Sequence, residues 1–376
     1  MDADVAIVGL GTMGSMAAWQ LTRREGVRVI GFDQYGLGHA RGAGAGESRL
    51  FRAAYHEGAG YVPLLIEARR LWQELERETG WELYRQIGAL SIGSTDLPQM
   101  SRVLESIRTY DLPAEVLDGE ELARRFPQHR PVDGEMGVLD LLGGALRPES
   151  AIRGALLAAE SAGAELHPGE AVTAIEPASG HVDVITADGS YRVGHVIVTV
   201  GPWSRQFLPD AGTALVVQRQ SLTWFVPRRP RLFAPDRFPA FIRDTDGVHI
   251  FGVPSLDGST VKAGITPFWD HRERVEDVDR WLDAADAAAI GEAVHRFLPD
   301  LGPEPARFDI YVESFVEDKT PRILRWQDSA RTTVLTGFSG HGFKLAPVFG
   351  RIASQFALDG GTAYGVDAFL EPLPSE

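Results

Sequence analysis

The first 33 residues contain the pattern that most constrains the fold of this chain. A buried strand over 4–8 leads into the turn Gly9-Leu10-Gly11-Thr12-Met13-Gly14, a helical run follows to about residue 24, and a second strand ends at Asp33. This order of strand, glycine turn, helix, strand and acid is the dinucleotide-binding fingerprint of a Rossmann-type sheet. It predicts a nucleotide site without separating NAD from FAD. The alternative is a βαβ unit that binds no ligand.

Each residue of the fingerprint has a physical role. Gly9 allows the tight turn, Gly11 lets the backbone approach a pyrophosphate, and Gly14 allows the helix to pack closely on the strand. The helix N-terminus presents free N–H groups and a partial positive charge to a phosphate. Asp33 lies about 20 residues past the turn, where its carboxylate can accept hydrogen bonds from ribose hydroxyls.

Composition limits the class of protein. A length of 376 residues predicts two domains or one large one. The net charge of −15 argues against a nucleic-acid surface. No run of 18 apolar residues is present, and the fingerprint begins within four residues of Met1. We therefore expect no membrane span, no signal peptide and a cytoplasmic protein.

The absence of cysteine excludes several chemistries. Disulfides, thiolate metal sites, cysteine nucleophiles and thioether-linked cofactors all need this residue. No H-E-x-x-H or similar spacing is present, and the ten histidines are scattered. We expect no metal.

The rest of the chain alternates in character. Helices are predicted over residues 61–78, 278–297 and 346–357, and a further helix is predicted from Ser150, as its N-cap, to residue 162. Strands are predicted over residues 87–92, 136–139 and 191–200. Residues 36–46 are glycine-rich and predict either a loop wrapped around a ligand or a flexible linker. From 215 to 316 the alternation predicts a mainly antiparallel sheet.

We therefore predict an α/β (α+β) chain of two domains. A discontinuous Rossmann-type nucleotide domain takes 1–80, 147–214 and 317–376, and a substrate domain built on the antiparallel sheet takes 81–146 and 215–316.

A second glycine turn, Gly337-Phe338-Ser339-Gly340-His341-Gly342-Phe343-Lys344, follows a predicted strand and opens a helix. It presents another helix N-terminus with a cation beside it. Taken alone, it could equally be a βα turn with a chance lysine.

This turn closely resembles the signature of monomeric sarcosine oxidases and N-methyltryptophan oxidases, FAD-dependent amine oxidases of the D-amino-acid oxidase superfamily. Further blocks of the chain resemble that family in the family's order, at 46–55 with 61–64, at 198–204, and at 251–255 with 261–264. The resemblance implies that the cofactor is FAD rather than NAD.

The resemblance also implies roles for four cations. Arg52 and Lys344 match the family's pair that holds the substrate carboxylate, a suitable task for a planar guanidinium in a dry site. Arg49 and Lys262 match the pair at the reactive face of the flavin. There the lysine is thought to activate oxygen, because a fixed cation stabilises developing superoxide and peroxide. The alternative for Lys262 is a surface lysine.

The remaining cofactor contacts are carried over from the fingerprint and the matching blocks. They are Gly9, Gly11, Thr12, Met13, Gly14, Asp33, Gly42, Ser48, Arg49, Val172, Gly201, Trp203, Gly337, Gly340, His341, Gly342, Phe343 and Lys344.

Departures from the family pattern alter the expected linkage of the flavin and the expected substrate. The family links FAD through a cysteine, whose neighbourhood here includes Ser314, so we expect FAD held without a covalent bond. Three pocket positions with polar aromatic or imidazole groups in the family correspond to Phe251, Thr266 and Val316. The substrate is therefore expected to be larger or more apolar than sarcosine.

The sequence thus predicts a monomeric oxidase that converts a carboxylate-bearing secondary amine to an imine, with O2 reduced to H2O2. The alternatives are a tailoring oxidase or dehydrogenase of secondary metabolism, acting on a cyclic imino acid or carrier-bound amine, a glycated-amine oxidase, and a flavoprotein without catalytic activity.

Overall fold

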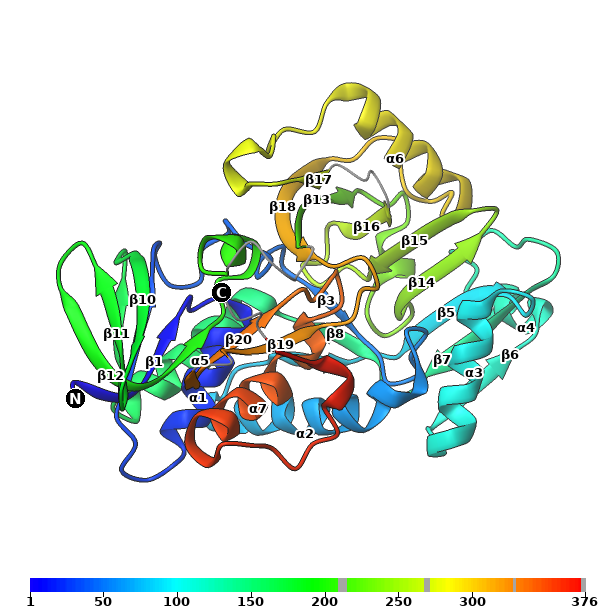
Figure 1. The fold of residues 1–376 in the computed structure, drawn as a ribbon. Helices are drawn as coiled ribbons and strands as arrows, with labels where there is room; N and C mark the ends of the chain where they lie inside the picture. Colours follow the sequence, from blue (N-terminus) through cyan, green and yellow to red (C-terminus); the bar gives the residue numbers. More distant parts are fainter. Residues whose placement is uncertain (209–214, 267–270, 327–328, 373–376) are drawn as a thin grey trace.

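The computed structural model describes residues 1–208, 215–266, 271–326 and 329–372. Two large sheets lie side by side, one with helices packed on it and one that is mainly antiparallel (Figure 1). This is the mixed α/β architecture that the sequence predicts.

The first sheet is mainly parallel. Its strands are β1 (Ala3–Val8), β2 (Val29–Asp33), β9 (Glu165–Pro168), β10 (Val172–Ala178), β11 (His181–Thr186), β12 (Ser190–Val198), β19 (Arg322–Trp326), β20 (Ser329–Thr336) and β21 (Leu370–Pro372). The order is β21-β19-β20-β12-β1-β2-β9, with β10 and β11 as an antiparallel extension of β12. Since β12 pairs in parallel with β1, the predicted return of 191–200 to the first βαβ unit is confirmed.

Helices cover one face of this sheet. They are α1 (Thr12–Thr22), α2 (Val62–Thr79), α5 (Pro148–Ser161) and α7 (Ala346–Asp359). Val5 and Ile7 of β1 join the core beneath these helices, whereas Ala6 and Val8 join a separate core on the opposite face. Burial on both faces is why β1 is apolar without alternation.

The second sheet is antiparallel except where β14 pairs in parallel with β5. Its strands are β5 (Ala89–Ser94), β6 (Ala114–Leu117), β7 (Glu135–Asp140), β13 (Val216–Phe225), β14 (Ala240–Thr245), β15 (Val248–Val253), β16 (Val261–Thr266), β17 (His271–Arg272) and β18 (Arg307–Phe315). The helices α3 (Pro98–Tyr110), α4 (Gly119–Arg125) and α6 (Ala284–Phe297) pack against it.

A third, short sheet consists of β3 (Arg49–Phe51), β8 (Gly144–Leu146) and β4 (Tyr84–Gln86), in the order β3-β8-β4. It carries Arg49, and Arg52 follows directly after β3. The two large sheets draw their strands from the two sets of ranges predicted for the two domains, and the domain division itself stays a prediction.

Some boundaries differ from those expected. The helix expected over 278–297 begins at Ala284, because the carboxylate of Asp283 accepts a hydrogen bond from the backbone N–H of Asp286 at 2.8 Å and starts it there. Ser150 is not the N-cap of α5, which starts at Pro148 with Arg147 in the capping position. Proline suits the first helical position because its missing N–H is not needed there.

No helix in the described part of the chain is long and apolar enough to cross a membrane.

Candidate active site

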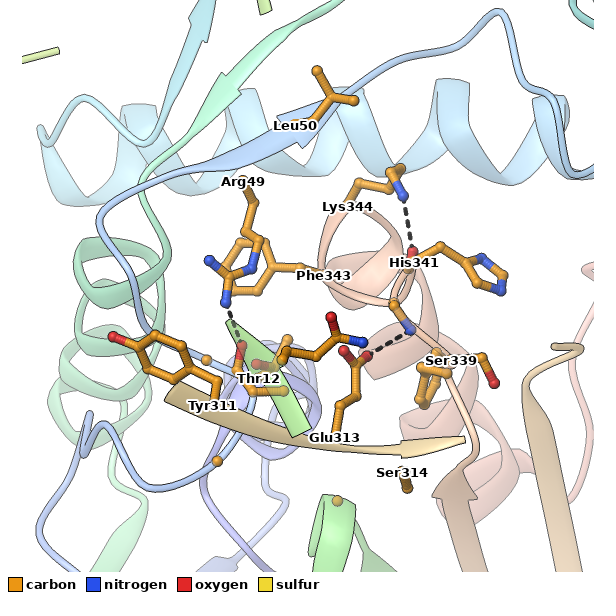
Figure 2. A pocket seen from close by; sticks show the side chains of 18 of the residues that line it. Thr12, Arg49, Leu50, Tyr311, Glu313, Ser314, Ser339, His341, Phe343 and Lys344 are labelled. Atoms are coloured by element: carbon orange, nitrogen blue, oxygen red, sulfur yellow. Dashed lines mark hydrogen bonds between the residues drawn. The ribbon is translucent and has the colours of Figure 1, made fainter. Parts of the chain in front are cut away.

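A cavity of about 600 Å³ runs between the two glycine turns. Its walls come from the first turn, the glycine-rich loop, the second turn and one face of the antiparallel sheet (Figure 2). A volume in this range is typical of sites for drug-sized ligands.

Most of the predicted site residues line this cavity. They are Gly11, Thr12, Met13, Asp33, Gly42, Ser48, Arg49, Arg52, Gly201, Trp203, Phe251, Lys262, Thr266, Gly340, His341, Gly342, Phe343 and Lys344. Five predicted residues do not line it: Gly9, Gly14, Val172, Val316 and Gly337. Val172 instead starts β10, and Val316 packs behind Gly337, where a Cβ on that glycine would come within 2.9 Å of it.

The first glycine turn has the geometry expected of its residues. Gly9 has φ +90°, and a Cβ on Gly14 would lie 1.9 Å from the carbonyl oxygen of Gly9, so neither position tolerates a side chain. Gly11 faces open space. Helix α1 begins there without a capping side chain or an acid in its first turn, which leaves its N–H groups available to an anion.

Asp33 lines the cavity but is already engaged by the chain. Its Oδ2 accepts a hydrogen bond from the backbone N–H of Leu10 at 2.9 Å, and its Oδ1 accepts one from Tyr35 at the same distance. The carboxylate therefore joins the first turn to the end of β2, and a ribose hydroxyl would share it with these donors.

Lys262, which is buried, and Arg49, which is partly buried, both lie beside the glycine-rich loop. Nζ of Lys262 donates to the carbonyl oxygens of Gly46 at 3.0 Å and Ser48 at 2.8 Å, and Arg49 donates to those of Ser48 and Ala43 at 2.9 and 2.7 Å. Burial, followed by the charge of Arg49, holds the pKa of Lys262 well below its usual value. Lys262 is thus an interior amine, and its alternative interpretation as a surface lysine is wrong.

Arg52 lies in the cavity wall with a carboxylate against it. Its Nη2 is 3.3 Å from Oε2 of Glu57, and its Nη1 is 2.7 Å from Nδ1 of His56. Burial would raise the pKa of Glu57, but the charges of Arg52 and its neighbours outweigh it and hold that pKa well below the usual value. Burial and the charge of Arg52 lower the pKa of His56, which leaves its imidazole neutral.

Lys344 is held by a hydrogen-bonded chain. Its Nζ donates to Tyr55 Oη at 3.2 Å and to the carbonyl of His341 at 3.1 Å, the second of which Figure 2 shows. Tyr55 Oη contacts Nδ1 of His341 at 3.0 Å, and Nε2 of His341 donates to the carbonyl of Lys319 at 2.7 Å. Burial lowers the pKa of Lys344 to about 8 and that of His341 to about 4. The imidazole is therefore neutral and accepts from Tyr55.

Asp140, at the end of β7, positions the segment that carries Arg52. Its buried Oδ2 accepts from the backbone N–H groups of Ala53 at 2.5 Å and Ala54 at 3.0 Å, and its Oδ1 accepts from Leu142 at 2.9 Å. The carboxylate thus ties the end of β7 to the segment after β3, next to Arg52 in the sequence.

Sequence reasoning missed several residues of the cavity. Glu313 points between the two glycine turns and accepts from the backbone N–H of Gly340 at 3.0 Å (Figure 2), and burial raises its pKa. His56, Asp244 and His249 also line the cavity. Asp244 and His249 pair across the β14–β15 hairpin, whose Asp246-Gly247 turn is a recognisable hairpin signal. Their side chains offset the loss of polarity expected at Phe251 and Thr266.

The lysines have an unusual distribution. The sequence has three, Lys262, Lys319 and Lys344, among 37 basic residues, and all three line this cavity.

Comparison with known proteins identifies the family. The family model for FAD dependent oxidoreductases (DAO) matches residues 4–356. The chain belongs to this family. Monomeric sarcosine oxidase of Streptomyces avermitilis is 37% identical over 375 residues, covering 97% of this chain and 96% of that protein. N-methyl-L-tryptophan oxidase of Yersinia pestis is 30% identical over 378 residues, covering 98% of each.

Solved structures agree on the DAO fold. NikD, titled an unusual amino acid oxidase essential for nikkomycin biosynthesis, superposes with a TM-score of 0.87 at 24% identity, covering 100% of this chain and 98% of that one. Glycine oxidase from Geobacillus kaustophilus gives 0.81 at 21% identity, covering 100% and 99%. The protein is thus a FAD-dependent oxidoreductase similar to sarcosine oxidase, as the sequence blocks indicate, and its chain has no cysteine to bind the flavin covalently.

The cavity fits FAD. The uncapped start of α1, the open face of Gly11 and the cradle of glycines in which a Cβ would clash suit a dinucleotide, and the second turn supplies further backbone N–H groups.

Proposed function

We propose that this oxidase acts on the C–N bond of a secondary amine that carries a carboxylate, an N-alkyl amino acid or a cyclic imino acid. The observation that supports this most is the convergence of Arg49, Arg52, Lys262 and Lys344 on one cavity from three separate segments: residues 49–52, β16 and the second glycine turn. Arg52, Lys262 and Lys344 are buried and Arg49 is partly buried, and this burial of basic groups costs desolvation energy that an anionic ligand would offset.

Arg52 and Lys344 would bind the substrate carboxylate. Arg52 offers a planar fork of donors, and Lys344, held by Tyr55 and the carbonyl of His341, offers a second cation. The same positive charges disfavour an ammonium ion nearby, so the amine would bind in its neutral form, which can be oxidised.

The flavin would lie between the glycine turns, near Thr12, Arg49 and Gly342, without a covalent bond. A bound FAD would supply two-electron oxidation at this position, with a hydride leaving the carbon beside the amine nitrogen and the two electrons passing on to O2. The products are an imine, which water hydrolyses to an amine and a carbonyl compound, and H2O2.

Lys262 would assist the oxygen reaction. Its amine has a lowered pKa and lies beside carbonyl oxygens and Arg49. Such a group takes up a proton as negative charge develops next to it, and the resulting cation stabilises reduced oxygen species.

The test is anaerobic mixing of the purified flavoprotein with N-methyl amino acids and cyclic imino acids, followed by air. Bleaching of the flavin with an N-methyl amino acid and release of H2O2 in air would support the proposal. Turnover only with a cyclic imino acid would narrow the substrate to that class, which is the one named in the tailoring alternative. No bleaching with any amine would favour a catalytically silent flavoprotein.

A further inference from the structure

One face of the antiparallel sheet arranges cavity residues in rows across the strands. Asp244 on β14 pairs with His249 on β15, and His249 pairs with Thr266 on β16, so these three form a polar row. Lys262 belongs to another row, with Val253 and Trp224. Since Lys262 and Thr266 are four residues apart on one strand, their Cα atoms lie about 13 Å apart. The polar row is thus remote from the oxygen-activating lysine.

The row between them is apolar. It consists of Ile242, Phe251 and Gly264, which are register partners on the same three strands. A substrate that reaches from the Lys262 row to the Asp244 row must therefore cross an apolar segment, which suits an alkyl chain.

The polar row carries a fixed carboxylate. Nδ1 of His249 lies 2.6 Å from Oδ1 of Asp244. Burial would raise the pKa of Asp244, but the hydrogen bond from His249 and the positive charges nearby lower it, so the group is ionised. Among the described residues, Oδ2 of Asp244 and Nε2 of His249 have no hydrogen-bond partner, and the two side chains keep 20% and 28% exposure in the cavity wall.

A further acceptor lies beside this row. Oε1 of Gln99 is buried and has no hydrogen-bond partner, although Gln99 lines both the main cavity and a small extension of it that also touches His56 and Asp244. A buried acceptor without a donor costs about 1–3 kcal/mol, so a ligand that donates to this oxygen would be favoured.

Arg52 is the permanent positive charge that acts on Asp244, and it already has a carboxylate partner. Glu57 is paired with Arg52, and His56, whose ring centre is 6.1 Å from that of His249, is neutral. Arg102 also lines the cavity but is itself exposed to solvent. The described part of the chain contains no group of three or more acidic, histidine or cysteine side chains that could hold a metal ion.

We propose that the substrate is an N-alkyl amino acid with a basic side chain, whose cationic end is bound by Asp244, His249 and Gln99 while its carboxylate is bound by Arg52 and Lys344. This inference rests on the proposed function and specifies its substrate class. It replaces the expectation of a more apolar amine.

Three matched substrates test it: Nα-methyl-lysine, N-methyl-norleucine and N-methyl-glutamate. The expected kcat/KM for the basic substrate exceeds that for norleucine by about ten- to a hundredfold, the usual effect of a charge-assisted hydrogen bond. Asp244→Asn should reduce this ratio to below about threefold, mainly by lowering kcat/KM for the basic substrate. Gln99→Leu should also reduce the ratio, and it provides the test if Asp244→Asn does not fold. Asp133→Asn, at an exposed aspartate, is the control and should leave the ratio unchanged.

Equal or better turnover of the norleucine or glutamate derivative would overturn the inference, as would a preference that survives Asp244→Asn. If no amine bleaches the flavin, the proposed function fails. Titration of the flavin absorbance with lysine and norleucine then tests the side-chain preference by itself, and equal dissociation constants would overturn it.

Discussion

Oε2 of Glu57 lies 3.3 Å from Nη2 of Arg52, so the arginine proposed to bind the substrate carboxylate already forms an ion pair with a carboxylate of the protein. A substrate carboxylate must compete with it. We expect Glu57→Gln to tighten the binding of acetate by about fivefold at pH 6.5, corresponding to about 1 kcal/mol. Flavin absorbance titration measures this. Glu47→Gln, which removes an exposed partner of Arg307, is the matched control, and unchanged or weaker binding in Glu57→Gln would show that Glu57 does not compete.

Carboxylate binding should weaken at alkaline pH. Burial lowers the pKa of Lys344 to about 8 in the free protein, and a bound carboxylate would raise it again. The protonated form binds, so the dissociation constant for acetate should be constant below about pH 7 and rise up to tenfold per pH unit above pH 8. In Lys344→Met the affinity should be lower and independent of pH between 7 and 9. A variant that keeps the pH dependence would assign it to another group.

The two interior lysines should act on different half-reactions. Lys262→Met should slow reoxidation of the reduced flavin by O2 about a hundredfold or more, because the cation beside the developing charge is lost, while flavin reduction changes little. Lys344→Met should instead weaken substrate binding and slow reduction. Stopped-flow absorbance separates the two steps. Equal slowing of both by Lys262→Met would contradict its assignment.

The flavin should be released completely on acid precipitation, since the chain has no cysteine to link it. Yellow colour in the pellet would instead indicate a covalent bond to another residue, such as a cavity histidine. Ser314 lines the cavity, and its Oγ accepts from the backbone N–H of Gly337 at 3.3 Å. If it is the counterpart of the linking cysteine, Ser314→Cys should retain part of the flavin with the protein.

Asp140 should matter for both stability and substrate binding. Its removal in Asp140→Ala leaves the backbone donors of Ala53, Ala54 and Leu142 without a partner. Each buried donor left without a partner costs about 1–3 kcal/mol, and removal of the buried carboxylate, whose charge is disfavoured by burial, offsets part of this cost. We therefore expect a net loss of about 2–4 kcal/mol in the free energy of unfolding and a higher KM. Asp133→Ala, at an exposed aspartate, should change neither quantity. Urea unfolding and steady-state kinetics provide the two readings.

Local rules predicted much of this fold. The fingerprint located β1, α1 and β2, because glycine conformations and helix N-termini are properties of short segments. The start of α6 was wrong by several residues, because the apolar pattern begins before the capping carboxylate of Asp283. Periodicity locates a helix, whereas its first residue depends on a single side-chain hydrogen bond.

Cavity residues that belong to local sequence motifs could be predicted. Cavity residues that meet only because two strands pair in a given register could not. Arg52, Lys262 and Lys344 belong to blocks that can be matched by sequence. Asp244 and His249 meet through the register of a hairpin, and Glu57 meets Arg52 across a segment whose backbone is bonded to the distant Asp140. These partners change the expected polarity of the pocket, which residue identities alone could not show.

The placement of every lysine in one cavity has a practical consequence. Reagents that acylate primary amines find no lysine target elsewhere on this protein, only its amino terminus. Lys319 is exposed, whereas Lys262 and Lys344 are buried in the cavity wall. Modification of Lys262 and Lys344 by succinimidyl reagents, measured peptide by peptide, would therefore report ligand occupancy, and resins of this chemistry should be avoided for immobilising active material. A single introduced surface cysteine would offer a clean attachment point, since no native thiol competes with it.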